Sequence, residues 1–223
     1  MTRTGQAEAG FRVVVFADFV CPYSYLAVGR YRKLAETHAV DISLRPVYPL
    51  AIRQPDFFER NHSNWLRYTF LDMMRVAQFH GIAFGPPRPD PIVQDIATRT
   101  IAAEQPYIRR ITRLGQAAAR RGRGLAFAHE AGMLIWGGQE GWNEGAHLAG
   151  AAERAGLPLA ELDAEVSGEP EALDAEIAAN QQALEQAGHW GVPTLVFDGE
   201  PFFGQDRIEM ARWRMQQKGL AER

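Results

Sequence analysis

Hydrophobic residues near the start of the chain follow two periods, one typical of strands and one typical of helices. Residues 11–16 form a short run rich in β-branched and aromatic side chains, which predicts a strand. Residues 24–35 carry apolar side chains at helical spacing, and residues 40–48 alternate apolar and polar side chains as a second strand would. Two strands joined by one helix are expected to pair in parallel through a right-handed crossover.

The middle of the chain, from about residue 65 to residue 185, has a helical pattern and almost no strand pattern. Glycine and proline residues divide it into shorter pieces. The predicted helices cover residues 65–80, 92–104, 107–121, 125–136, 144–155, 159–166 and 170–187. Alanine-rich faces in these pieces suit close helix packing, so we expect an all-α block and not a linker.

Strand pattern returns near the end of the chain. Residues 191–197 and 200–203 are separated by Asp198-Gly199, a dipeptide typical of β-hairpin turns. A last amphipathic helix is predicted from Asp206 through Met215, and the Asp206 carboxylate suits the N-cap position. The predicted order of elements is therefore βαβ, a helical block, and ββα.

Composition and charge narrow the classes of function. The chain has 223 residues, of which 46% are hydrophobic, and its net charge of −3 argues against a nucleic-acid-binding surface. No apolar stretch approaches the roughly 20 residues that span a bilayer, and residues 1–10 lack the apolar part of a secretory signal, so we expect a cytoplasmic protein without a membrane segment. The six histidines show no ligand-pair spacing, so no metal site is expected.

Cys21 is the only cysteine, and it stands directly before the first predicted helix. A single cysteine excludes an internal disulfide and a two-thiol redox cycle within one chain. Unpaired N–H groups and the positive end of a helix dipole favour a thiolate at this position, whereas apolar surroundings would leave the thiol inert. The pattern alone leaves both alternatives open.

The order of elements resembles an α/β thioredoxin-like fold with a helical insertion, as in DsbA-like proteins. Within that group the chain is similar to 2-hydroxychromene-2-carboxylate isomerases and kappa-class glutathione transferases. The matching segments are residues 16–27, Arg67-Tyr68 with Asp72 and Arg75, residues 84–87, residues 136–141, Asn180 and residues 191–207. The resemblance implies a thioredoxin-like domain made of residues 11–50 and 188–223, with residues 51–187 as a helical insertion domain.

The resemblance also implies that glutathione is the cosubstrate and gives roles to the matched positions. Pro193 would follow a cis peptide bond, which would let the backbone of Val192 pair with the cysteinyl part of glutathione. Gln205 and Asp206 would receive the γ-glutamyl end, with the Asp206 carboxylate paired to its ammonium group. The helix-cap role of Asp206 could hold at the same time.

Two residues of the motif Cys21-Pro22-Tyr23-Ser24 depart from the related families. Isomerases typically have serine at the position of Cys21, and redox relatives typically have a second cysteine at the position of Ser24. Ser24 could donate a hydrogen bond to the Cys21 sulfur, or it could cap the helix. The resemblance therefore leaves four functions open: a glutathione-dependent isomerase acting on a small aromatic electrophile, a kappa-type transferase, a DsbA-like monothiol oxidoreductase, or a binding module.

Several side chains are candidates for the walls of a substrate pocket. Tyr23, Tyr48, Trp65 and Tyr68 are the main candidates, with Phe57, Phe58 and Phe84 beside them, although aromatic residues of such a chain are more often core. Asn61 and His62 could contact substrate or belong to a solvated loop. The resemblance further implies a homodimer and a role in the catabolism of aromatic compounds.

Overall fold

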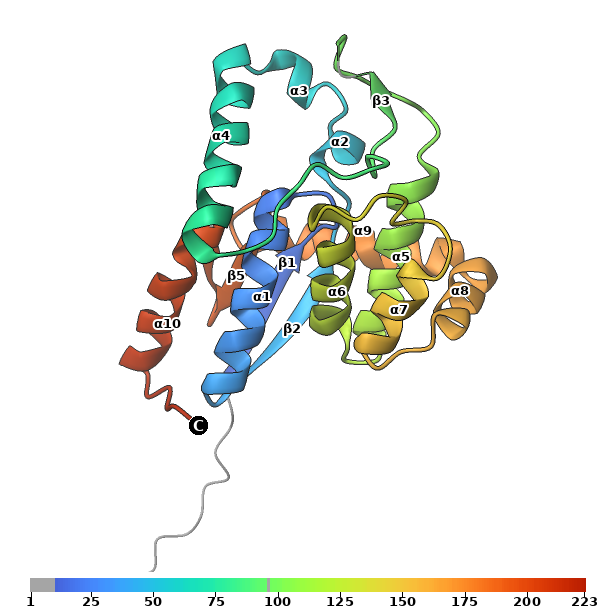
Figure 1. The fold of residues 1–223 in the computed structure, drawn as a ribbon. Coiled ribbons are helices and arrows are strands. Elements are labelled where there is room, and N and C mark those ends of the chain that lie inside the picture. The colour runs from blue at the N-terminus through green and yellow to red at the C-terminus, as the bar shows by residue number, and fades with distance from the viewer. Residues whose placement is uncertain (1–10, 96) are drawn as a thin grey trace, which may run out of the picture.

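The computed structural model describes residues 11–95 and 97–223. Its main sheet has the strand order β2-β1-β5-β6 (Figure 1). Strand β1 (Phe11–Ala17) pairs in parallel with β2 (Val40–Pro46), and β5 (Thr194–Phe197) pairs antiparallel with both β1 and β6 (Glu200–Phe203). The predicted parallel pair and hairpin are confirmed, but the strand predicted from residue 191 begins only at Thr194.

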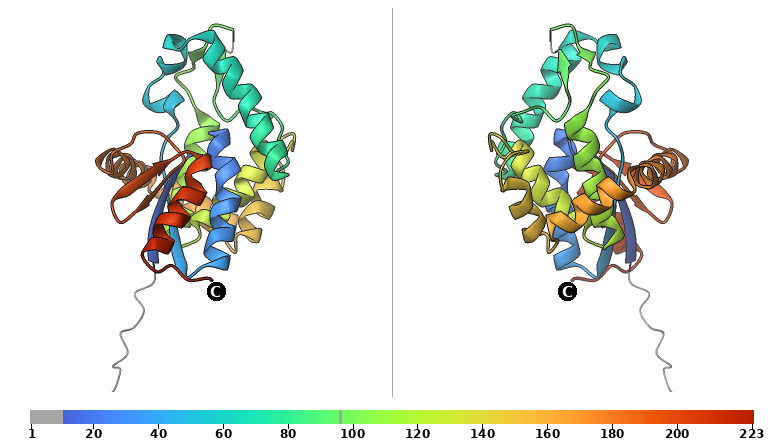
Figure 2. Two further views of the ribbon diagram at one scale, coloured as in Figure 1. Left: turned by 90° about the vertical axis from the view of Figure 1, so that its left-hand side faces the viewer. Right: turned by 90° about the vertical axis from the view of Figure 1, so that its right-hand side faces the viewer.

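Side chains of β1 alternate between two hydrophobic layers. Val13 and Val15 belong to the main core under α1 (Pro22–Thr37) and α10 (Ile208–Gln217). Phe16 instead belongs to a smaller cluster with Leu184 of α9 (Pro170–Gln186). Figure 2 shows the result, with α1 and α10 on one side of the sheet and α9 on the other.

The central part of the chain is mostly helical. Its helices besides α9 are α2 (Leu50–Arg53), α3 (Phe57–Arg60), α4 (Ser63–His80), α5 (Pro106–Arg120), α6 (Gly124–Trp136), α7 (His147–Arg154) and α8 (Leu159–Gly168). The main core includes residues of this part and of the sheet alike, so the division into two domains stays a prediction.

The helix predicted for residues 92–104 is wrong. This segment contains two short antiparallel strands, β3 (Gln94–Asp95) and β4 (Thr100–Ile101). The Asp95 carboxylate accepts hydrogen bonds from the N–H groups of Ala97 and Thr98, and the Gln105 side chain bonds to both backbone groups of Val93. Side chains thus satisfy backbone groups that a helix would have paired internally.

The end of the chain also differs from the prediction at Asp206. A short 3-10 helix, η1 (Gln205–Arg207), comes before α10, and Arg207 occupies the N-cap position of α10. The Asp206 carboxylate makes no capping hydrogen bond and pairs with Arg207 at 2.6 Å instead. The predicted N-cap role of Asp206 is therefore wrong, which leaves the carboxylate at the surface.

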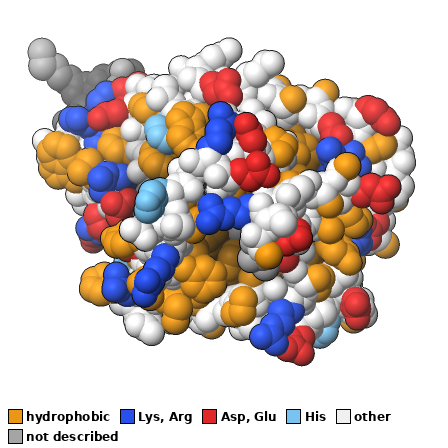
Figure 3. Space-filling model, turned by 90° about the horizontal axis from the view of Figure 1, so that it is seen from above, with side chains coloured by type: hydrophobic (Ala, Val, Ile, Leu, Met, Phe, Trp, Pro, Cys, Tyr) orange, Lys and Arg blue, Asp and Glu red, His pale blue; other side chains and the backbone are white. Residues whose placement is uncertain are grey.

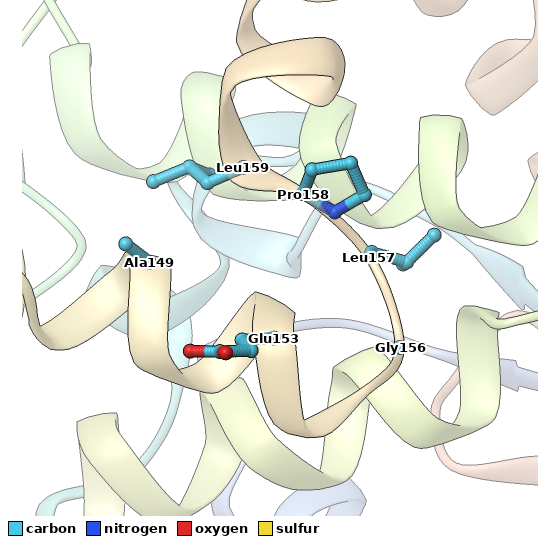
Figure 4. Close-up of a pocket in the computed structure, with 6 residues that line it drawn as sticks. All are labelled: Ala149, Glu153, Gly156, Leu157, Pro158 and Leu159. Carbon is cyan, nitrogen blue, oxygen red and sulfur yellow. The ribbon is translucent and has the colours of Figure 1, made fainter.

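None of the helices in the described part of the chain is long and apolar enough to cross a membrane. A surface hollow of about 510 Å³ lies between α7 and α8 (Figure 4). It is lined by Ala149, Glu153, Gly156, Leu157, Pro158 and Leu159, and it contains none of the predicted site residues.

Candidate active site

The loop between β1 and α1 is held by the carboxylate of Asp18. This carboxylate accepts hydrogen bonds from the backbone N–H groups of Val20, at 3.0 Å, and of Cys21. Pro22 begins the helix, where its missing N–H is not needed. Cys21 consequently occupies the N-cap position, and its carbonyl accepts the first helical hydrogen bond from Tyr25.

The loop before α1 and the loop before β5 meet at the thiol of Cys21. Its Sγ lies 3.5 Å from the carbonyl oxygen of Val192, to which the thiol donates. The Val192–Pro193 peptide bond is cis, as the family resemblance implies. The Pro193 carbonyl accepts a hydrogen bond from the N–H of Gly204, so the same loop fixes the turn that leads into Gln205.

Gln205 is held by an arginine of the first helix. Arg30 donates to both the backbone carbonyl and the side-chain Oε1 of Gln205, at 2.7 and 2.8 Å. The amide nitrogen of Gln205 remains as a donor, and Asp206 follows it with an exposed carboxylate. At Gly204, where φ is +108°, a Cβ atom would lie 2.5 Å from the Asp206 Oδ1, so glycine leaves the space that this carboxylate occupies.

Ser24 lies inside the site but does not cap the helix, because the helix begins two residues earlier. Its side chain is fully buried, and its hydroxyl accepts a long hydrogen bond, 3.5 Å, from the N–H of Asp18. Its hydrogen bonding also lowers the pKa of the Cys21 thiol. The predicted cap role of Ser24 is therefore wrong, and its hydrogen bond to the Cys21 sulfur stays a prediction.

Two neighbouring acids in the site are both hard to ionise. Cys21 keeps part of its surface open, but the packing around it is dense, and burial raises the pKa of its thiol to about 12. The charge of Asp18 adds to this shift, against the smaller effect of hydrogen bonds from Ser24 and Tyr23. Burial also raises the pKa of Asp18 to about 6, against the hydrogen bonds from Cys21 and Val20. A neutral thiol is therefore favoured over a thiolate.

Three of the four main wall candidates lie on α1 and α4. The Tyr23 hydroxyl donates to Asp72 at 2.7 Å, and burial is the main cause that raises the pKa of Tyr23. Tyr68 is 60% exposed on α4, and Trp65 is 40% exposed and packs edge-on against Phe57. Tyr68 and Trp65 therefore keep open aromatic surface on α4.

Tyr48 has a structural partner that the sequence analysis did not anticipate. Its hydroxyl donates to Asp174 at 2.6 Å, and Arg113 binds the same carboxylate through two nitrogens at 2.8 and 2.6 Å. The Tyr48 hydroxyl is therefore committed to a link between the end of β2 and α9, and only its ring remains for substrate.

Other sequence candidates have local structural roles. The His62 side chain caps α4 by accepting a hydrogen bond from the N–H of Asn64, and the Asn61 amide donates to the carbonyl of Phe57. The ring of Phe84 stacks on Trp136 at 5.3 Å and on Tyr25 at 6.4 Å. These contacts place the three residues in the scaffold of the insertion.

Three residues near Cys21 were missed as functional candidates: Asp18, Arg53 and Trp190. Asp18 stands three positions before Cys21, and that spacing was the one signal available. Arg53 donates through Nε to the carbonyl of Tyr48 at 2.6 Å and through Nη1 to that of Trp190 at 3.1 Å.

Viewed from above, the molecule is hollowed near its centre, with hydrophobic side chains inside and basic side chains at the edge (Figure 3).

A family model of the DSBA-like thioredoxin domain matches residues 12–216. The chain belongs to this family. The predicted α/β thioredoxin-like fold is thereby confirmed, including its helical insertion. A comparison with curated protein sequences gave no match.

Solved structures similar to this DSBA-like protein include an isomerase and redox proteins. A 2-hydroxychromene-2-carboxylate isomerase has 23% identity and a TM-score of 0.65, with 92% of this chain and 95% of that chain covered. A probable DsbA oxidoreductase from Streptomyces coelicolor has 21% identity and a TM-score of 0.65, with 93% and 89% covered. The cytosolic disulfide reductase DsbM from Pseudomonas aeruginosa has 21% identity and a TM-score of 0.61, with 93% and 98% covered. At these identities the likeness establishes the shared fold.

Proposed function

We propose that the protein is a glutathione-dependent isomerase of the 2-hydroxychromene-2-carboxylate isomerase type, acting on a small aromatic electrophile. The observation that carries the proposal is the state of Cys21. Burial keeps its thiol protonated, and the thiol donates to the Val192 carbonyl. The position where redox relatives have their second cysteine is occupied by the buried Ser24. If the thiol turns from the Val192 carbonyl, it can donate to the sulfur of bound glutathione, which is the role that the family resemblance implies for a serine hydroxyl at this position.

The residues around Cys21 fit glutathione. Within the described residues the N–H of Val192 has no acceptor, so it is available to an extended peptide laid beside it. The Gln205 amide and the Asp206 carboxylate can receive the charged γ-glutamyl end. When bound, glutathione supplies the thiol that adds to the conjugated substrate and is released unchanged. The open rings of Trp65 and Tyr68 would hold the aromatic part of the substrate and exclude water.

The test is an assay of the purified protein with 2-hydroxychromene-2-carboxylate, with and without glutathione, for the wild type and for Cys21→Ser. We expect turnover that depends on glutathione in both proteins, equal or faster in Cys21→Ser because a hydroxyl is the stronger hydrogen-bond donor. Absence of turnover in both proteins would contradict the isomerase assignment. A kappa-type transferase would instead consume glutathione, and a binding module would bind it saturably without reaction.

A monothiol oxidoreductase is the second candidate, because Cys21 lies directly beside the cis-proline loop and is partly open. DsbM, one of the similar structures, was also solved with GSH. In this reaction the Cys21 sulfur would attack a disulfide, forming a mixed disulfide and releasing one thiol, and glutathione would then reduce it. Mass spectrometry after mixing with oxidised glutathione should then show one glutathione on Cys21, and an unmodified protein would count against this reaction. Either function would place the protein in the cytoplasm, where glutathione is plentiful.

A further inference from the structure

The guanidinium group of Arg53 is fixed between two loops of the candidate active site. Arg53 is the last residue of α2, which follows the carboxyl end of β2. Its Nε donates to the carbonyl of Tyr48 and its Nη1 to the carbonyl of Trp190, two residues before Val192. Two bonds to separate loops hold the planar group in one orientation.

The third nitrogen of this guanidinium has no partner. Nη2 of Arg53 is buried and makes no hydrogen bond, and Arg53 forms no ion pair with any carboxylate of the described residues. Arg113, by contrast, binds Asp174 through two nitrogens. A buried donor without an acceptor carries a desolvation cost, and a buried cation carries a larger one. An anion bound beside Arg53 would supply the missing acceptor and offset the buried charge.

The loop that carries the cis-proline links Arg53 to Cys21, because Arg53 bonds to Trp190 and the Cys21 thiol bonds to Val192. Burial lowers the pKa of Arg53, and the charges of Asp18, Glu185 and Cys21 oppose that shift, in this order. The Asp18 and Glu185 carboxylates are thus close enough to act on the guanidinium without pairing to it. Trp190 is 45% exposed, and its ring lies 5.9 Å from that of Phe57. The guanidinium of Arg53 thus bonds to the backbone of a residue whose aromatic ring keeps open surface.

We propose that Arg53 anchors the carboxylate of a ligand bound beside Cys21. Two ligands of the proposed reaction carry a carboxylate that could reach this position: glutathione, through its glycyl end, and the aromatic substrate. The choice of these two ligands rests on the proposed function, whereas the proposal of an anion rests on the unpaired, buried guanidinium nitrogen.

The test compares acids with their neutral esters in equilibrium binding, followed by tryptophan fluorescence. One arm uses glutathione and its glycyl monoethyl ester, and the other uses 2-hydroxychromene-2-carboxylate and its methyl ester. In the wild type we expect one arm to show an acid bound about 10- to 100-fold more tightly than its ester, as for a hydrogen bond to a charged group. Arg53→Gln should lose that preference and keep the ester affinity, and Arg53→Lys should retain part of it.

Arg45→Gln is the matched control, because Arg45 lies exposed on β2 and its guanidinium faces only the ring of Phe16. The proposal is overturned if Arg53→Gln keeps the preference for the acid, if the wild type shows none in either arm, or if acid and ester weaken equally. The last result would mean that Arg53 only supports the loops. The protein could also prefer the acid, lose that preference in Arg53→Gln, and yet show no isomerase turnover. That result would support the role of Arg53 as a carboxylate anchor and contradict the proposed function.

Discussion

Burial makes the carboxyl group of Asp18 and the thiol of Cys21 harder to ionise, and the charge of Asp18 raises the pKa of the thiol further. Position at a helix start favours a thiolate, but here burial outweighs the helix dipole, whose effect is typically below about 1 kcal/mol at such exposure. The Asp18 carboxylate also accepts a hydrogen bond from the N–H of Cys21, and this N–H is then no longer available to stabilise a thiolate. The local sequence pattern could not show this, because it depends on what packs above the helix start.

Cys21 should react slowly with alkylating reagents. With a thiol pKa near 12, we expect iodoacetamide at pH 8 to label the folded protein at least about 10-fold more slowly than the same protein unfolded in urea. Labelling is followed by mass spectrometry. Asp18→Asn should label faster than the wild type, since it removes a charge that raises the thiol pKa. Equal rates in the folded and unfolded protein would contradict the neutral thiol.

Asp18 should also make stability depend on pH. Its pKa rises from 3.8 in the unfolded chain to about 6 in the folded protein, so the folded state binds more protons between these values and stability falls as pH rises through them. We expect Asp18→Asn to remove this cost, which is up to about 3 kcal/mol at pH 8. Urea unfolding at pH 4 and pH 8 measures this cost. The free energy of unfolding of the variant should exceed that of the wild type at pH 8 and not at pH 4. The same difference at both pH values would rule out this titration.

At the scale of elements, α5 of the insertion positions the loop that carries Cys21. Gly115 of α5 faces the ring of Phe19, which lies two residues before Cys21, and a Cβ atom at Gly115 would lie 2.2 Å from that ring. Phe19 is buried and packs edge-on against Phe127 of α6 at 5.9 Å. The loop therefore depends on a close approach that glycine alone permits.

Gly115→Ala should displace Phe19 and with it the active-site loop. We expect a loss of about 1–3 kcal/mol in the free energy of unfolding, as for an overpacked core, together with reduced turnover. Denaturant unfolding and the isomerase assay measure the two effects. Gly168→Ala is the control, because a Cβ atom there meets nothing within 4 Å. If both variants behaved alike, the close packing of α5 on the loop would play no part.

The elements that sequence reasoning predicted well are those with long, regular patterns, such as residues 24–35 and the hairpin around Asp198-Gly199. It failed at residues 92–104, where Asp95 and Gln105 replace helical hydrogen bonds with side-chain ones. For the site, the motifs located Cys21 and the cis-proline loop, which the structure brings together. Arg53 and Trp190 were missed, because their roles arise only when separate loops meet.

At the scale of the whole molecule, α4 stands out because little covers it. Only Met73 and Ala77 of this helix are buried. Its exposed large side chains are Trp65, Tyr68, Phe70, Leu71, Met74 and Phe79, and α10, next along the same side of the molecule, adds Met210 and Trp213 (Figures 1 and 2). Apolar surface of this extent is typical of an interface.

We expect a second copy of the chain to cover the side of α4 that carries Leu71 and Phe79, which agrees with the homodimer that the sequence resemblance implies. Sedimentation should then give a mass of twice 24.9 kDa at micromolar concentration. Phe79 is 85% exposed and Leu71 is 45% exposed, so the double variant Leu71→Ser/Phe79→Ser should weaken association by at least about 10-fold if both side chains are buried in the dimer. Val93→Ser, on another exposed apolar residue outside α4 and α10, should leave the mass unchanged. A wild type that sediments as a monomer throughout would show that this face serves another partner or none.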